Sequence, residues 1–229
     1  MNTTSERSIR PRRSFIFTPG LKPEMFPKAL ASGTDMVCIE LEDGVAPKYK
    51  DEARKNGLAL FEQPQADDGV ERIMRINSLR SAFGIADVQA ILACETPPPG
   101  LMLPKVMSPD EINWLEELLN ECGHDCRLHV IIETNAGLEA AFEIAQASQR
   151  IEALFFGGVD MAADLRCKNA WEPLLYARSK VVHAAAAAGI DAIDVPYLAP
   201  AQHDCQPPVQ WDDPFPPKGS FAVHSYWQP

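Results

Sequence analysis

The sequence predicts an α/β fold in which a parallel sheet closes into a (β/α)8 barrel, and three observations support this prediction. Short runs rich in β-branched and aromatic residues alternate with longer stretches of helical pattern, which indicates repeated β–α units. A charged or strongly polar residue ends each short run and recurs about every 30 residues, the length of one strand, one helix and their loops. The chain has no glycine-rich phosphate-binding turn, which a doubly wound open sheet usually carries. We therefore expect a barrel of the TIM type.

Each expected strand is a run of four to six mostly apolar residues, bounded by polar or turn residues. In chain order these strands are residues 14–18, 36–41, 73–76, 100–103, 128–132, 153–156 and 191–195. Between them, apolar residues recur at the three- to four-residue spacing of an amphipathic helix. The expected helices are residues 22–32, 50–62, 85–93, 109–121, 137–148 and 174–188. Residues 221–224 are the candidate for a short eighth strand, so whether the barrel is complete at its C-terminus stays open.

The alternation of strands and helices ends near residue 198. Eight of the 34 residues from Pro196 to Pro229 are proline, and proline lacks the backbone donor that helices and inner strands use. We expect residues 1–198 to form the barrel domain and residues 199–229 to form a proline-rich irregular tail.

Charge and hydropathy limit the classes of partner. The formal net charge of −11 argues against a broad surface that follows nucleic-acid phosphates. No apolar run reaches the roughly 18 residues of a membrane-spanning helix, and the N-terminus lacks the apolar core of a secretory signal. We expect a cytoplasmic protein with no nucleic-acid and no membrane partner, with an organellar leader as the alternative because several arginines lie near the N-terminus.

Two acids that follow neighbouring strands form the most informative candidate site. Glu133 follows the apolar run 130–132, and Asp160 follows the run 155–156 after two glycines. Two carboxylates provide the oxygen ligands that Mg²⁺ prefers, with water or substrate completing the shell. Gly158 adds backbone that a substrate can approach closely. The alternative is that both acids only cap the next helix or face solvent.

Three further charged residues lie at the ends of earlier strands. Arg75 alternates with Met74 and Ile76, so its side chain should point to the opposite side of the sheet from theirs. There its guanidinium group can form a bidentate pair with a carboxylate. Glu42 and Asp43 are adjacent acids after the second strand, and alternation lets at most one point straight into the site. The alternatives are an exposed strand-end arginine and a solvated turn.

Six motifs in order resemble those of the citrate lyase beta-chain family, a part of the wider HpcH/HpaI aldolase group that also includes malyl-CoA and citramalyl-CoA lyases and malyl-CoA thioesterases. The resemblance runs from about Arg13 to Leu198, and six motifs in the family's order are more specific than any one of them. The motifs are Arg13-Ser-Phe-Ile-Phe-Thr-Pro-Gly20, Leu41-Glu-Asp-Gly-Val-Ala-Pro47, Arg75-Ile-Asn77, Leu103-Pro-Lys-Val106, Ile132-Glu-Thr-Asn-Ala-Gly137 and Phe156-Gly-Gly-Val-Asp160.

The resemblance implies a Mg²⁺-dependent carbon–carbon lyase that acts on a 2-hydroxy or 2-oxo acid or its CoA thioester. It implies that Glu133 and Asp160 hold the metal, that Glu133 also lies against substrate, and that Arg75 clamps a substrate carboxylate. Arg75 and the two acids that border the site, Glu42 and Asp43, are the candidate catalytic residues. The alternatives are a malyl-CoA-type thioesterase and an oxyacid-binding barrel impaired in catalysis. A homo-oligomer is also implied.

Overall fold

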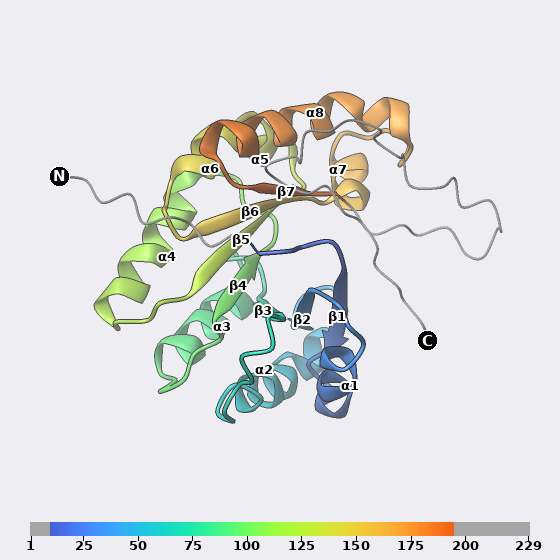
Figure 1. Cartoon of the computed structure of the whole chain (residues 1–229). Helices are drawn as coiled ribbons and strands as arrows, with labels where there is room; N and C mark the ends of the chain where they lie inside the picture. Colours follow the sequence, from blue (N-terminus) through green and yellow to red (C-terminus); the bar gives the residue numbers. More distant parts are fainter. Residues whose placement is uncertain (1–9, 195–229) are drawn as a thin grey trace.

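The computed structural model describes residues 10–194, which form one sheet of seven parallel strands in the order β1 to β7 (Figure 1). The strands are β1 Phe15–Pro19, β2 Met36–Glu40, β3 Glu71–Arg75, β4 Gly100–Leu103, β5 Arg127–Ile132, β6 Ile151–Phe156 and β7 Asp191–Ile193. The first six begin and end within two residues of the expected ranges. The predicted parallel α/β fold is therefore confirmed.

Helices follow the strands along the chain. The α-helices are α1 Phe26–Leu30, α2 Lys50–Ala59, α3 Ala82–Leu92, α4 Pro109–Glu121, α5 Asn135–Glu139, α6 Ala141–Gln146, α7 Gly158–Asp164 and α8 Trp171–Ala188, and the 3-10 turns are η1 Pro23–Met25 and η2 Pro47–Tyr49. No helix within residues 10–194 has the length and apolar character needed to cross a bilayer.

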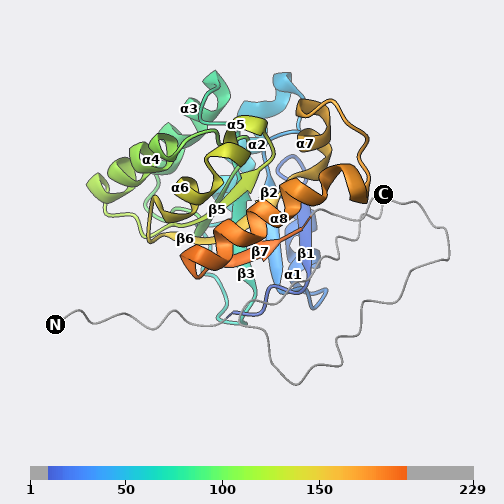
Figure 2. The same cartoon turned by 90° about the horizontal axis from the view of Figure 1, so that it is seen from above.

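The sheet curls strongly into a barrel wall (Figure 2). Strands β1 and β6 are five positions apart, which in a flat sheet would separate them by about 24 Å. Yet the ring centroids of Phe15 in β1 and Phe155 in β6 are only 5.6 Å apart. Within residues 10–194, β1 and β7 remain the edges of the sheet. The candidate eighth strand at 221–224 and the tail at 199–229 lie outside the described residues, so the division at residue 198 stays a prediction.

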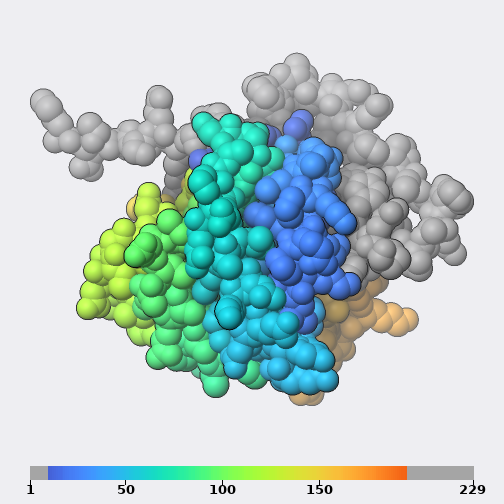
Figure 3. Space-filling model, turned by 90° about the horizontal axis from the view of Figure 1, so that it is seen from below, coloured from blue at the N-terminus to red at the C-terminus, as the bar shows by residue number. Residues whose placement is uncertain are grey.

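Alternation along each strand separates an outer core from an inner one. In β2, Val37 and Ile39 pack in the larger cluster with residues of the helices, whereas Met36 and Cys38 pack in the smaller cluster inside the curve. Helices α1 to α4 lie side by side over the outer face in chain order, as the colours from blue to yellow-green show in Figure 3. Strands β2 to β6 are therefore buried on both faces over most of their length, as expected for a parallel sheet, whereas the edge strands β1 and β7 are mostly only partly buried.

The helix boundaries differ from the sequence expectation at several places, each with a local cause. The expected helix 137–148 is divided at Ala140, whose φ of −91° and ψ of 11° leave the helical region. Helix α3 begins three residues early because the Ser81 hydroxyl accepts a hydrogen bond from the Gly84 amide at 3.0 Å. Helix α7 was not among the expected helices; it begins at Gly158, directly after Gly157. Helix boundaries thus depend on capping contacts that periodicity does not reveal.

A buried ionic cluster joins the ends of the described chain at the amino-terminal side of the strands. The Arg12 guanidinium, in a residue only 5% exposed, donates to Glu71 at 2.7 and 3.1 Å, to Asp191 at 2.6 Å and to Glu152. His129 Nε2 lies 3.0 Å from Glu71 Oε1. One arginine that precedes β1 therefore contacts acids of β3, β6 and β7, which holds the sheet in its curve.

Loss of the central cation should destabilise the fold strongly. We expect Arg12→Met to lower the free energy of unfolding by about 3–5 kcal/mol, because three carboxylates would lose their buried counter-charge. The control is Arg13→Met, whose side chain is 69% exposed and pairs with Asp35; it should cost about 1 kcal/mol or less. Urea denaturation at neutral pH measures both. Equal losses in the two variants would show that the Arg12 cluster does not hold the sheet.

The same cluster should make stability fall in acid. Burial by itself raises the pKa of Glu71, but contacts with His129 and Arg12 outweigh it and hold that pKa well below the ordinary 4.5. A carboxyl with a lowered pKa contributes stability that is complete above its unfolded value and is lost as the pH falls through the folded one. The stability difference between the wild type and Glu71→Gln should therefore shrink below about pH 4.5. Urea titrations from pH 7 to 3 test this, and a constant difference would contradict it.

Candidate functional site

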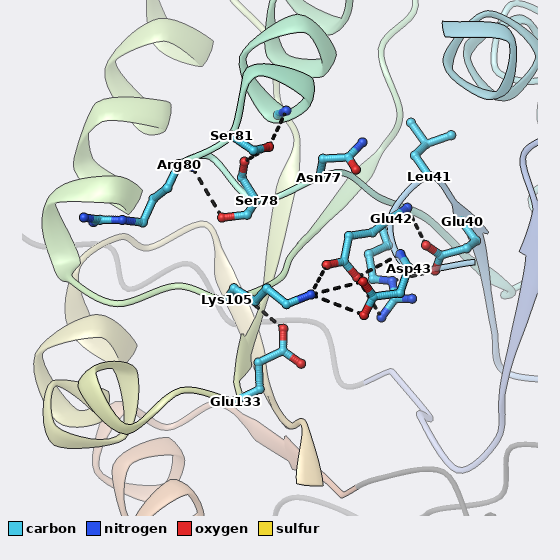
Figure 4. Close-up of polar contacts among 12 residues, drawn as sticks. Glu40, Leu41, Glu42, Asp43, Asn77, Ser78, Arg80, Ser81, Lys105 and Glu133 are labelled. Atoms are coloured by element: carbon cyan, nitrogen blue, oxygen red, sulfur yellow. Dashed lines mark hydrogen bonds and ion pairs between the residues drawn. The ribbon is translucent and has the colours of Figure 1, made fainter. Parts of the chain in front are cut away.

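Charged side chains gather at the carboxyl ends of consecutive strands (Figure 4). In a barrel of parallel strands this rim is where side chains from several units converge. The cluster comprises Glu40 at the end of β2, Glu42 and Asp43 just after it, Arg75 at the end of β3, Lys105 after β4, Glu133 after β5 and Asp160 in α7. We call these seven residues the rim cluster.

The acidic turn after β2 is held by a buried lysine. Lys50 Nζ donates to the carbonyl oxygens of Leu41 at 2.7 Å and Glu42 at 2.6 Å. The Glu42 amide donates to the Glu40 carboxylate. The Glu42 side chain is 7% exposed and that of Asp43 is 59% exposed. Alternation predicts that at most one of these two acids points straight into the site, and this stays a prediction. Glu42 is the buried acid of the pair, and both carboxylates contact Lys105.

Arg75 lies on the inner face of the sheet, as its alternation with Met74 and Ile76 predicts. Its Nε donates to Glu40 Oε2 at 2.5 Å, its Nη1 lies 3.5 Å from Glu42 Oε2, and its guanidinium carbon lies 4.7 Å from the centre of the Phe17 ring. Burial raises the pKa of Glu40, although Arg75 opposes this. Arg75 is thus fixed in place by two of the chain's own acids, and its contact with a substrate stays a prediction.

Lys105 links the acidic turn to Glu133. Its Nζ contacts Glu42 and lies 3.2 Å from both carboxylate oxygens of Asp43, and its amide donates to Glu133 Oε1 at 2.8 Å. Burial by itself lowers the pKa of Lys105, but the contact with Glu42 outweighs it and leaves that pKa raised. The ammonium group is therefore charged at neutral pH.

Glu133 and Asp160 come from neighbouring units. Ile132 pairs with Phe156 across β5 and β6, and the Gly157 amide donates to Ile132 O at 3.1 Å, so the two loops start side by side. Burial, followed by the charges of Asp160 and Glu42, raises the pKa of Glu133 to about 8. A carboxylate in this position is stabilised by any added positive charge. Asp160 is partly buried in the first turn of α7, and Gly158 is buried at its start.

The donor set of the rim cluster fits a hard divalent cation. Five carboxylates face two cationic side chains, so the cluster has an excess of negative charge when all groups are ionised. All the acidic donors are oxygen atoms, which Mg²⁺ prefers to nitrogen or sulfur. Among residues 10–194, no three His, Cys, Asp or Glu side chains gather closely enough to hold a metal by themselves. Two protein carboxylates with water and substrate oxygens would suit Mg²⁺, which commonly keeps several non-protein ligands.

Two members of the rim cluster were not among the candidate residues. Glu40 falls in the inward phase of β2 with Met36 and Cys38 and pairs in register with Arg75. Alternation could therefore have identified it. Lys105 ends a strand run and lies in the fourth motif, but only the fold shows that it contacts three acids from other loops.

Comparisons with known proteins agree with this architecture. The sequence pattern of the HpcH/HpaI aldolase/citrate lyase family matches residues 13–206. Human mitochondrial citramalyl-CoA lyase is 30% identical over 213 residues, which cover 86% of this chain and 62% of that protein. Citrate lyase subunit beta of Escherichia coli K12 is 33% identical over 201 residues, which cover 84% of this chain and 66% of that protein. The chain therefore spans less than two thirds of the length of these relatives.

A solved structure shows the same fold with a metal. The citrate lyase beta subunit of Mycobacterium tuberculosis, complexed with oxaloacetate and magnesium, is 28% identical with a TM-score of 0.66. The likeness covers 81% of this chain and 79% of that one. A relative of this kind establishes the class of the fold, a TIM-barrel-type α/β structure.

The packing of Gly157 against Glu133 makes a test of this geometry. A Cβ atom at Gly157 would lie 2.4 Å from both Cβ and Oε2 of Glu133, although the backbone, with φ of −89°, accepts alanine. We expect Gly157→Ala to displace Glu133 and to destabilise the protein by about 1–3 kcal/mol through overpacking. Urea denaturation measures the loss. Because alanine accepts the φ of this position, a loss of stability would come from the contact between the added methyl group and Glu133. Unaltered stability would contradict the close approach.

Proposed function

Because the chain belongs to the HpcH/HpaI aldolase/citrate lyase family, we propose that it is a Mg²⁺-dependent carbon–carbon lyase. Its substrate would be a 2-hydroxy or 2-oxo acid or the CoA thioester of one. Two of its relatives are a citramalyl-CoA lyase and a citrate lyase beta subunit, and a third binds oxaloacetate with magnesium.

One observation carries the proposal: a buried carboxylate lies beside other acids where it is hard to ionise. Burial and the charges of Asp160 and Glu42 raise the pKa of Glu133 to about 8. A divalent cation between Glu133 and Asp160 would remove this repulsion and hold both groups ionised. The structural position of the pair, at the carboxyl ends of β5 and β6, is where barrel enzymes place their reacting groups.

The residues of the rim cluster would have different roles in such a reaction. Glu133 and Asp160 would hold the metal, which when bound polarises the hydroxyl or carbonyl oxygen of the oxyacid. Arg75, fixed by Glu40, would orient a substrate carboxylate through its planar guanidinium. Gly158, without a side chain, would let the substrate approach the backbone at the start of α7.

The two acids after β2 are suited to proton transfer. When a 3-hydroxyacyl compound is cleaved, the hydroxyl loses its proton, the carbon–carbon bond breaks, and the acyl fragment leaves as an enolate that must gain a proton. Glu42 and Asp43 are the carboxylates of the rim cluster that would hold or move these protons. Glu42 is held by Lys105 and Arg75, whereas Asp43 is 59% exposed and is the more accessible of the two.

The metal ligands give the most direct test. We expect Glu133→Gln and Asp160→Asn each to weaken Mg²⁺ binding by more than about tenfold. Mutation of a residue that only hydrogen-bonds a metal ligand already lowers metal affinity by about tenfold or more, and these two residues are the proposed ligands themselves. Each variant should also abolish turnover and leave the fold intact. Calorimetry with Mg²⁺, circular dichroism and an assay with malyl-CoA and citramalyl-CoA measure these effects. The control is Glu143→Gln, an exposed acid on α6.

The outcomes separate this function from its alternatives. Glyoxylate and acetyl-CoA from malyl-CoA support a lyase, whereas malate and free CoA support a thioesterase. Mg²⁺-dependent binding of an oxyacid without turnover of any acyl-CoA supports an oxyacid-binding barrel. Unchanged Mg²⁺ affinity and turnover in both ligand variants would refute the proposed metal site.

Assembly and location stay proposals. We propose that the protein is a homo-oligomer, because β1 and β7 are sheet edges within residues 10–194 and edges favour pairing or cover. Light scattering on the full chain would determine its molar mass. A cytoplasmic location is likewise proposed from the composition.

A further inference from the structure

We propose that Lys105 is a substrate-binding residue of the rim cluster. Its ammonium group leaves Asp43 and donates a hydrogen bond to a second oxygen atom of the substrate, apart from the oxyacid group. This inference rests on the proposed function, since it assumes an oxyacid held at Glu133 and Asp160. It adds a specificity: the substrate should carry a carboxylate or thioester carbonyl at its far end as well as the oxyacid group.

Lys105 lies between Glu133 and the acidic turn after β2. Its amide contacts the Glu133 carboxylate at 2.8 Å, and its ammonium group reaches toward the acidic turn after β2 (Figure 4). The residue adopts a φ of 55°, a left-handed conformation that glycine accepts and a lysine adopts only at a cost. Strain of this kind persists where surrounding contacts hold it, and it concentrates at sites of function. The conformation directs both the amide and the ammonium group of one residue to the site.

The two cations of the rim cluster differ in how easily they can exchange partners. The side chain of Arg75 is 16% exposed and bonds at 2.5 Å to Glu40, whose side chain is 6% exposed. The side chain of Lys105 is 31% exposed and has two acidic partners. It keeps the contact with Glu42, whose side chain is 7% exposed, and it lies 3.2 Å from Asp43, whose side chain is 59% exposed. A solvent-facing ion pair contributes little net stability, whereas separating a buried pair leaves an uncompensated charge. Lys105 can therefore give up Asp43 far more readily than Arg75 can give up Glu40.

This exchange has a chemical consequence. When the Lys105 ammonium group moves to a substrate anion, Asp43 loses a positive neighbour and becomes available as a proton acceptor. Arg75 and Lys105 come from the ends of β3 and β4, which are adjacent strands. A substrate with oxygen atoms at both ends could thus contact the two cations together, while one with a single carboxylate would use only one of them.

Two ligands that differ by one carboxylate test the proposal. Oxaloacetate and pyruvate share the 2-oxo acid group, and only oxaloacetate has a second carboxylate. With saturating Mg²⁺, calorimetry should show that Lys105→Met weakens oxaloacetate binding about tenfold or more, the usual size of a lost charged hydrogen bond. Pyruvate binding should change less than about twofold. Lys105→Arg should retain part of the preference for oxaloacetate.

Further variants separate binding from folding. Lys105→Gly removes the ammonium group but suits the φ of 55°, so it should fold and behave like Lys105→Met. Lys55→Met, at an exposed position on α2, is the matched control and should bind both ligands as the wild type does. In the absence of an oxyacid, the affinity for Mg²⁺ should not fall in Lys105→Met or Lys105→Gly, because both variants remove a positive charge that lies near the acids.

The outcomes distinguish failure of the role of Lys105 from failure of the proposed lyase function. An equal loss for oxaloacetate and pyruvate, or an unchanged ratio of their affinities in Lys105→Met and Lys105→Gly, would overturn the role of Lys105 and leave the proposed function standing. If the wild type binds neither oxyacid with Mg²⁺, the proposed function fails and the role of Lys105 fails with it.

Discussion

The burial of one guanidinium is the constraint on which the rest of this structure depends. Arg12 lies outside the strands, yet it contacts acids on β3, β6 and β7. Those contacts act across the inside of the sheet, where backbone hydrogen bonds between neighbouring strands cannot reach. Because a buried charge without a partner is costly, the acids and the arginine must stay together. The sheet therefore keeps the curve that brings its later strands over its first one.

The curve in turn creates the candidate site at the other end of the strands. Arg75, Lys105 and Glu133 come from three successive units: the side chains of Arg75 and Lys105 both contact Glu42, and the Lys105 amide donates to Glu133. The two ends differ in how their charges are held: at the amino end one buried arginine contacts three acids, and at the carboxyl end five carboxylates face two cationic side chains. Burial, followed by the charges of Asp160 and Glu42, raises the pKa of Glu133 to about 8, and an added cation would stabilise its ionised form. Stability and chemistry thus occupy opposite ends of one barrel wall.

The site could be predicted in part because strand ends can be recognised from local patterns. Glu133, Asp160 and Arg75 were identified from their position after apolar runs, and the structure brings Glu133 and Asp160 to neighbouring loops. Lys105 was harder to identify, because its importance lies in contacts with Glu42, Asp43 and Glu133 from other loops. Glu42 and Asp43 lie beyond the end of β2, so alternation within the strand does not show that both carboxylates contact Lys105.

The order of the strands, and their ends to within about two residues, could be predicted from the sequence alone, because a strand buried on both faces needs an apolar run that is visible in the chain. The division of the helix at Ala140, the presence of α7 and the partners of each charged side chain were decided only by the tertiary structure. Helix ends depend on capping contacts, and the pKa of a carboxyl depends on charges that are distant in sequence and close in space. The pattern of the sequence therefore indicates the class of fold, whereas the tertiary structure determines which charged side chains contact one another.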